Sequence, residues 1–136
     1  MAKRRQTARV RIPSYRYPRN VWRELIHAEV TKCVRSRKIK YNHKDKLELI
    51  ITLYLDEKPL QFHDVDNRLK DIMDALQGRV GGSKSQHKVP PIIPNDHQIY
   101  RVTIEKMLPP KQSHGMGHLI ITKYKPMREK IPHRTT

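Results

Sequence analysis

Apolar and polar residues alternate in four stretches of the chain, and this two-residue period predicts β-strands. The clearest stretch covers residues 47–55. Apolar side chains occupy both sets of alternating positions there, so we expect this strand to lie in the centre of its sheet. The weaker stretches are residues 8–12, 98–106 and 119–124.

Apolar residues recur every three or four positions in two other segments, which predicts two amphipathic helices. The first begins after Asn20, a residue type that caps helices, and ends near Lys38, with Trp22 on its apolar face. The second covers residues 64–77 and ends at Gly78, a residue type typical of helix ends. Its apolar stripe comprises Val65, Leu69, Ile72, Met73 and Leu76.

The segments between these elements predict turns and loops. We expect residues 56–59 to turn the chain and residues 79–94 to form a long loop, too polar and broken to pack. In the third strand we expect Tyr100, Val102 and Ile104 on one face. The order strand, helix, strand, helix, strand, strand predicts a mixed α/β (α+β) fold, with a single small mixed sheet flanked by two helices.

The length of 136 residues suits a single domain. We expect that domain over residues 8–124, between a basic arm (1–7) and a basic tail (125–136). A lone cysteine, Cys33, excludes an intrachain disulfide and a cysteine-based zinc site. The sequence shows neither a signal peptide nor an apolar stretch long enough for a bilayer, so we expect a cytoplasmic protein without a membrane partner.

The charge balance indicates a polyanionic partner. The chain has 29 Lys and Arg against 13 Asp and Glu, a formal net charge of +16. Self-repulsion opposes such an excess, whereas a nucleic acid that releases counterions on binding favours it. The glycines at 81 and 82 lack the Gly-Lys-Ser/Thr pattern of a phosphate-binding loop, so no nucleotide cofactor is expected.

Acidic residues gather at one place in this basic chain. Asp66, Lys70 and Asp74 are spaced four apart, so they line up along the second helix, and Asp64 stands at its start. The simplest interpretation is structural: Asp64 caps the helix, and Asp66 forms an exposed pair with Lys70.

A second segment favours a functional interpretation. Asp96 precedes the third strand, and if that strand packs beside the second helix, Asp96 meets Asp64 and Asp66. Three clustered carboxylates suit a hard divalent cation, Mg²⁺ with Mn²⁺ as a substitute. Such an ion supports phosphodiester hydrolysis, and Lys70 would stabilise the charge that develops on the phosphate.

These segments together resemble the RusA family of Holliday-junction resolvases. The resemblance covers Asp64-Val65-Asp66-Asn67, Lys70, Asp74-Ala75-Leu76 and Asp96-His97-Gln98-Ile99. It implies a homodimeric, magnesium-dependent endodeoxyribonuclease that nicks opposing strands of a four-way junction during DNA recombination and repair. It also implies a nucleoid-associated protein of a bacterium or phage. By this resemblance Asp64, Asp66 and Asp96 bind the metal, Lys70 is the essential lysine, and the catalytic set is Asp64, Asp66, Lys70 and Asp96.

The sequence departs from the family pattern at Asn95, where the family often has a second acid, and in the length of the loop over residues 79–94. Two alternatives therefore stay open: a nuclease for other branched DNA, and a non-catalytic basic nucleic-acid-binding protein. Phe62 is assigned to the core, with a wedge at the DNA branch point as the alternative. His63, Asp74 and His97 are accessory candidates. The candidate DNA-binding residues are Arg68, Arg79, Lys84, Lys88 and Arg101.

Overall fold

A computed structural model describes residues 6–81 and 88–127. It confirms the mixed α/β class and the predicted order of elements, with one short helix added before the second long helix. The strands are β1 (Ala8–Ile12), β2 (Leu47–Tyr54), β3 (Ile99–Met107) and β4 (Gly117–Lys123). The helices are α1 (Arg19–Ser36), α2 (Glu57–Phe62), α3 (Val65–Leu76) and a single 3-10 turn at Asp96–Gln98.

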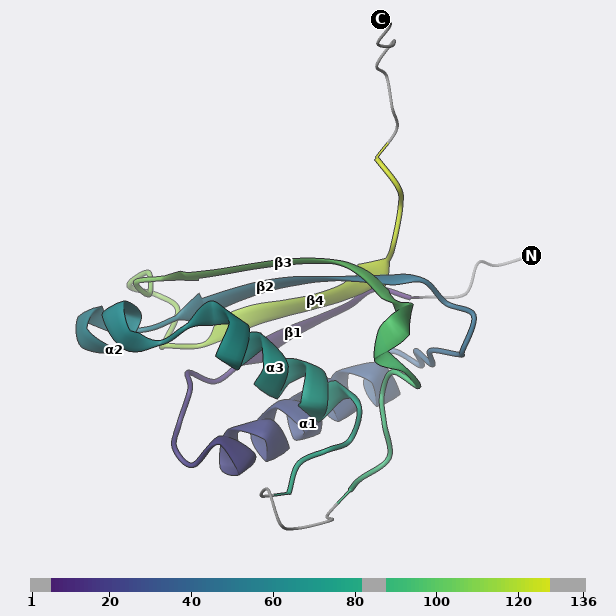
Figure 1. The fold of residues 1–136 in the computed structure, drawn as a ribbon, viewed down its shortest axis with the longest axis horizontal. Coiled ribbons are helices and arrows are strands. Elements are labelled where there is room, and N and C mark those ends of the chain that lie inside the picture. The colour runs from purple at the N-terminus through teal and green to yellow at the C-terminus, as the bar shows by residue number, and fades with distance from the viewer. Residues whose placement is uncertain (1–5, 82–87, 128–136) are drawn as a thin grey trace, which may run out of the picture.

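The strands form one mixed sheet in the order β1-β4-β2-β3 (Figure 1). Strand β2 pairs in parallel with β3 and antiparallel with β4, and β4 pairs antiparallel with β1. The prediction of a central β2 is confirmed, because it has a neighbour on each side. Strand β3 is an edge strand, so the backbone groups on its outer side have no partner strand in the described part of the chain.

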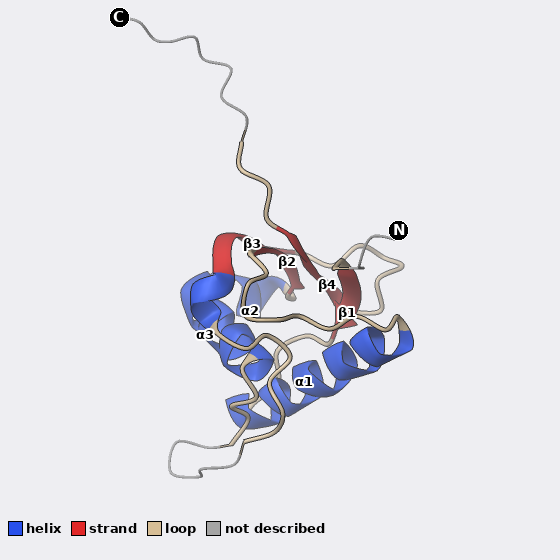
Figure 2. Cartoon of the chain, turned by 90° about the vertical axis from the view of Figure 1, so that its right-hand side faces the viewer, coloured by secondary structure: helices blue, strands red, loops and turns tan. Residues whose placement is uncertain are grey.

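Helices α1 and α3 lie side by side across one face of the sheet (Figures 1 and 2). Alternate residues of β1, β2 and β4 are buried beneath them, as the two-residue period predicts. Trp22 is fully buried, as predicted, and its indole N–H donates to the carbonyl of Pro13 at 2.9 Å. No helix of residues 6–81 and 88–127 has the length and apolar character needed to cross a bilayer.

Three local predictions are wrong at segment boundaries. The expected turn at residues 56–59 belongs largely to α2, and α1 begins one residue before Asn20, with Pro18 at its cap position. The loop over residues 79–94 packs better than expected, since Val80 and Ile93 are buried in the part that the structure describes. Gly78 does end α3, in a left-handed conformation with φ of +80°.

Tyr100 does not share a face with Val102, contrary to the prediction. Leu47 pairs with Ile99, but Glu48 pairs with Arg101, so Tyr100 is an extra residue in a β-bulge. Val102 packs against the core, whereas Tyr100 is exposed and lies 5.2 Å from the ring of Tyr124.

Candidate functional site

The start of α3 presents two aspartates to solvent. Asp64 occupies the N-cap position, Asp66 is the second helical residue, and both are exposed. Neither forms an ion pair with a described residue. One oxygen of Asp66 accepts from the backbone N–H of Asn67 at 3.1 Å. Lys70, also exposed, follows one turn later on the same side of the helix.

Strand β3 holds the start of α3 in place. The ammonium group of Lys106 donates to the carbonyl oxygens of Leu60 and His63, at 2.5 and 2.9 Å. The His63 ring lies 4.9 Å from the ring of Tyr15, which precedes α1. Phe62, expected in the core, is instead 79% exposed, two residues before Asp64 in the chain. The core prediction for Phe62 is therefore wrong, because α2 ends at the surface instead of continuing a buried strand.

His63 joins the aspartates to a cluster of cations. Burial lowers the pKa of His63, the charges of Arg68 and Lys106 lower it further, and only Asp64 opposes them. Nδ1 of His63 lies 3.3 Å from a guanidinium nitrogen of Arg68. Since a guanidinium only donates, Nδ1 accepts, and the proton of the neutral ring sits on Nε2.

The middle of α3 carries a second pair of aspartates with different surroundings. Asp71 is fully buried, and its Oδ1 accepts from Arg19 at 2.8 Å and from Arg23 at 3.0 Å. Arg68 approaches the other oxygen of Asp71 to 3.3 Å. Arg23 also contacts Asp74 at 3.1 Å. Asp74, an accessory candidate, therefore joins α3 to α1 in this structure.

Arg68 is buried, which contradicts its expected contact with DNA. Its guanidinium lies 3.7 Å from the centre of the Tyr15 ring and beside the carboxylate of Asp71. An aromatic face and a carboxylate together compensate the loss of water around a guanidinium. The predicted apolar stripe is largely confirmed, because Ile72 and Leu76 are buried and Leu69 and Met73 pack against the core, but the buried face of α3 is shifted to one side of it. It comprises Arg68, Asp71, Ile72, Ala75 and Leu76.

Asp96 lies at the opposite end of the fold from Asp64 and Asp66. The backbone N–H groups of Ile92 and Ile93 donate to the carbonyl of Leu76, which fixes the segment before Asp96 at the C-terminal end of α3. Helix α3 is about 18 Å long at 1.5 Å per residue. Strand β3 then runs back along the sheet to Lys106, at the start of α3 (Figure 1).

The predicted convergence of three acids is therefore wrong within one chain. Among residues 6–81 and 88–127, no three His, Cys, Asp or Glu side chains are placed to hold one metal ion. The physical reason is the parallel pairing of β2 and β3. Because the start of β3 lies beside the start of β2, Asp96 is at the edge of the sheet that α3 reaches only at its C-terminal end.

The remaining candidates lie apart from the start of α3. Arg101 pairs with Glu48 at 3.0 Å and donates to the carbonyl of Lys125, so its charge is already engaged. Arg79 and Lys88 are exposed and form an isolated β-bridge. His97 is exposed next to Asp96. Lys84 falls outside the described residues, as do residues 1–5 of the arm and residues 128–136 of the tail.

Sequence reasoning missed a hollow of about 550 Å³ between α1 and the segment before Asp96. Its lining includes the cationic residues Arg35 and Lys40 and the imidazoles of His27 and His43. The sequence signal is indirect, because these residues are polar positions of α1 and of the loop that follows it, and periodicity predicts only that such positions are solvated.

The chain matches no protein-family model, and no curated protein is detectably similar to it.

Proposed function

We propose that this protein is a divalent-metal-dependent endodeoxyribonuclease that acts on branched DNA, with the Holliday junction as its substrate. The observation that carries the proposal is the exposed couple of Asp64 and Asp66, which forms no ion pair with a described residue although the chain has a net charge of +16. Arginines neutralise Asp71 and Asp74 farther along the same helix. A bound metal ion would supply the positive charge that no described residue supplies to Asp64 and Asp66.

The donor set at the start of α3 fits a hard cation. Carboxylate oxygens are the ligands that Mg²⁺ and Mn²⁺ prefer, and both aspartates are accessible from solvent. A bound ion would supply charge stabilisation at the phosphate and an acidified water. Lys70 would contact a non-bridging oxygen of the phosphate, one turn from Asp66. The predicted site has three acids, and one chain supplies only two of them at this place. The third carboxylate would therefore have to come from another chain.

A second copy of the chain would supply Asp96. Edge strand β3, about 30 Å long, offers backbone groups that no described strand pairs with. If two β3 strands pair antiparallel across a two-fold axis, the start of one lies beside the end of the other. Asp96 lies in the 3-10 turn directly before the start of β3, and Lys106 near the end of β3 is hydrogen-bonded to the segment that leads into α3. Each site in such a homodimer would combine Asp64 and Asp66 of one copy with Asp96 of its partner.

Phe62 supports the preference for branched DNA in this proposal. The exposed ring precedes Asp64 by two residues in the chain, and it is not among the described side chains that pack as the core. A ring at this position would occupy the gap where base stacking is interrupted at a junction.

The direct test is cleavage of an immobile four-way junction in Mg²⁺. Asp66→Asn should reduce cleavage by at least about 100-fold, the range that metal-site changes reach, while junction binding in EDTA is retained. Glu24→Gln removes an exposed acid from α1 and serves as the matched control. Normal cleavage by Asp66→Asn, or none by the folded wild type with either Mg²⁺ or Mn²⁺, contradicts the proposal.

Mixing inactive variants tests the shared site. A heterodimer of Asp66→Asn and Asp96→Asn has one site with both changes and one intact site, so mixing the two variants should restore nicking. Mixing Asp64→Asn with Asp66→Asn should not, because those residues belong to the same half of each site. If the first mixture stays inactive although subunits exchange, Asp96 does not act with the partner's couple.

Thermal unfolding separates this proposal from a basic nucleic-acid-binding protein without catalysis. Millimolar Mg²⁺ should raise the Tm of the wild type and leave that of Asp66→Asn unchanged, because a ligand that binds only the folded state stabilises it. A wild-type Tm that does not respond to Mg²⁺ favours the non-catalytic protein.

A further inference from the structure

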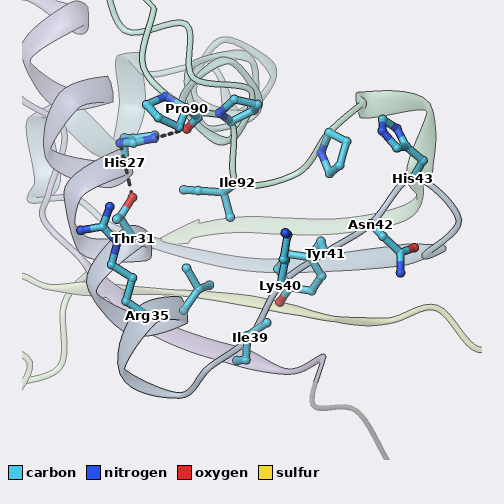
Figure 3. A pocket seen from close by; sticks show the side chains of 13 residues that line it. His27, Thr31, Arg35, Ile39, Lys40, Tyr41, Asn42, His43, Pro90 and Ile92 are labelled. Carbon is cyan, nitrogen blue, oxygen red and sulfur yellow. Dashed lines mark hydrogen bonds between the residues drawn. The ribbon is translucent and has the colours of Figure 1, made fainter.

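The hollow between α1 and the segment before Asp96 is formed by three separate stretches of chain (Figure 3). They are the second half of α1, residues 39–43 and residues 90–94. Its volume of about 550 Å³ falls within the range of small-molecule sites. It lies away from the acidic couple, toward the end of the fold that carries Asp96.

The floor of the hollow is apolar. Ile39 is buried, and Val34 and Ile92 pack against the core while still lining the hollow. Ile92 and Lys40 extend into it from different segments in Figure 3. Proline rings extend the apolar surface on one side, at positions 90, 91 and 94. Such a surface favours a flat, apolar group over a hydrated ion.

The rim of the hollow is cationic. Arg35, in the last turn of α1, and Lys40 are exposed, and the imidazoles of His27 and His43 complete the polar rim. None of the described residues that line the hollow is acidic. An apolar floor with a cationic rim matches a ligand that has an apolar ring at one end and a phosphate at the other.

Hydrogen bonds fix the three stretches to one another and to neighbouring segments. His27 Nε2 lies 2.8 Å from the carbonyl oxygen of Pro90, which ties α1 to the proline-rich wall. The hydroxyl of Tyr41 donates to the carbonyl of Gln6 at 2.7 Å. Gln98 donates to the carbonyl of Asn42 at 2.6 Å, which joins the loop to the 3-10 turn that contains Asp96. A ligand would therefore meet a site whose walls are already in place.

We propose that this hollow binds one unpaired nucleotide of the DNA substrate, with its base on the apolar floor and its phosphate against Arg35 and Lys40. The proposal rests on the proposed function for the identity of the substrate. A paired base is enclosed within its duplex, so only an unstacked nucleotide can enter the hollow. An apolar floor distinguishes this site from a surface that holds only the phosphate backbone, which needs no apolar contact.

Fluorescence anisotropy with labelled 12-mers in EDTA tests the nucleotide site. Oligodeoxythymidylate should bind about tenfold more tightly than an abasic strand with the same number of phosphates, since the base alone adds apolar contact. Arg35→Ala should weaken both strands by several fold. Lys32→Ala, the matched control, removes an exposed cation from the same helix outside the hollow and should change neither affinity beyond the small effect of net charge.

Two further variants isolate the base contact. Ile92→Ser removes part of the floor, and Thr31→Phe fills the hollow from the α1 side without touching the core. Each should reduce oligodeoxythymidylate binding to the level of the abasic strand while leaving the abasic affinity in place. Wild-type affinities that are equal for the two strands overturn the proposal in favour of backbone binding alone, and so does normal base preference in a folded Thr31→Phe protein.

Cleavage plays no part in this measurement. Base-dependent binding in EDTA together with an inactive wild type would contradict the nuclease and keep the nucleotide site. Junction cleavage together with base-independent binding would support the nuclease and contradict the nucleotide site. If vesicles with anionic headgroups bind in a way that depends on Arg35 whereas the oligonucleotide does not bind, the hollow takes a lipid headgroup and the nucleotide site is wrong.

Discussion

Four aspartates along one helix have opposite surroundings in its two halves. Asp71 and Asp74, in the middle of α3, are held by arginines of α1 and by Arg68, and Asp71 is fully buried. Asp64 and Asp66, at the start of α3, are exposed and form no ion pair with a described residue. The difference shows that local acidic composition alone does not define a metal site. The acids with cation partners maintain the fold, and those without partners are the candidates for chemistry.

The largest expected loss of stability comes from neutralising Asp71, the buried one of the four aspartates. Asp71→Asn leaves Arg68 buried without its carboxylate and weakens the contacts to α1, so it should lower the free energy of unfolding by about 3–5 kcal/mol. Urea denaturation measures this change. Asp66→Asn, the same substitution at the exposed end, should cost no more than about 1 kcal/mol, the range of a helix-terminal charge. Similar losses of stability for the two variants would contradict the distinction between the structural and the exposed aspartates.

The second largest loss of stability is expected at the C-terminal end of α3. Gly78→Ala should destabilise the fold by about 2–4 kcal/mol, because the residue keeps a strained positive φ and its side chain collides with a carbonyl. An added Cβ would lie 2.1 Å from the carbonyl oxygen of Val89. Gly115→Ala is the matched control, with a φ of +77° but only a 3.5 Å contact to Ser14. It should cost about 1 kcal/mol by urea denaturation. Equal losses would mean that the collision is relieved by movement of the loop.

Replacing the two arginines of α1 that contact Asp71 should destabilise the fold to different extents, because one is more buried than the other. Arg23 is 13% exposed and bridges Asp71 and Asp74, so Arg23→Met should cost about 1–3 kcal/mol. Arg19 is 44% exposed and contacts Asp71 alone, so Arg19→Met should cost less than about 1 kcal/mol because water screens the pair. Thermal unfolding of both variants at low and high salt measures the difference. A larger loss at Arg19 would contradict the assignment of Arg23 as the link between α1 and α3.

The smallest effect on stability is expected at Phe62. Because its side chain is 79% exposed, Phe62→Ala should change the free energy of unfolding by less than about 0.5 kcal/mol. The affinity for a four-way junction should fall several fold relative to that for duplex DNA. A large loss of stability would return Phe62 to the core, and an unchanged junction preference would remove its role at the branch point.

Periodicity predicted the elements that bury an apolar face. Strands β1 and β2, the interior position of Trp22 and the end of α3 at Gly78 are confirmed. Periodicity failed where a charged residue is buried or the register changes. Arg68 and Asp71 are on the inner face of α3 because each compensates the other, and the bulge at Tyr100 reverses the facing of β3. Neither the buried ion pair nor the bulge changes the local pattern of apolar residues on which the prediction depends.

The amino-acid sequence by itself determined the class of the fold, the strongly basic character of the chain and the presence of an acidic couple with a lysine one turn away. These properties depend on local spacing and on composition. Only the tertiary structure decided which acids are neutralised, that Asp96 lies a helix length from Asp64, and that a cationic hollow adjoins that end. The reason is that each depends on strand pairing and helix docking, which bring together residues that no local pattern relates.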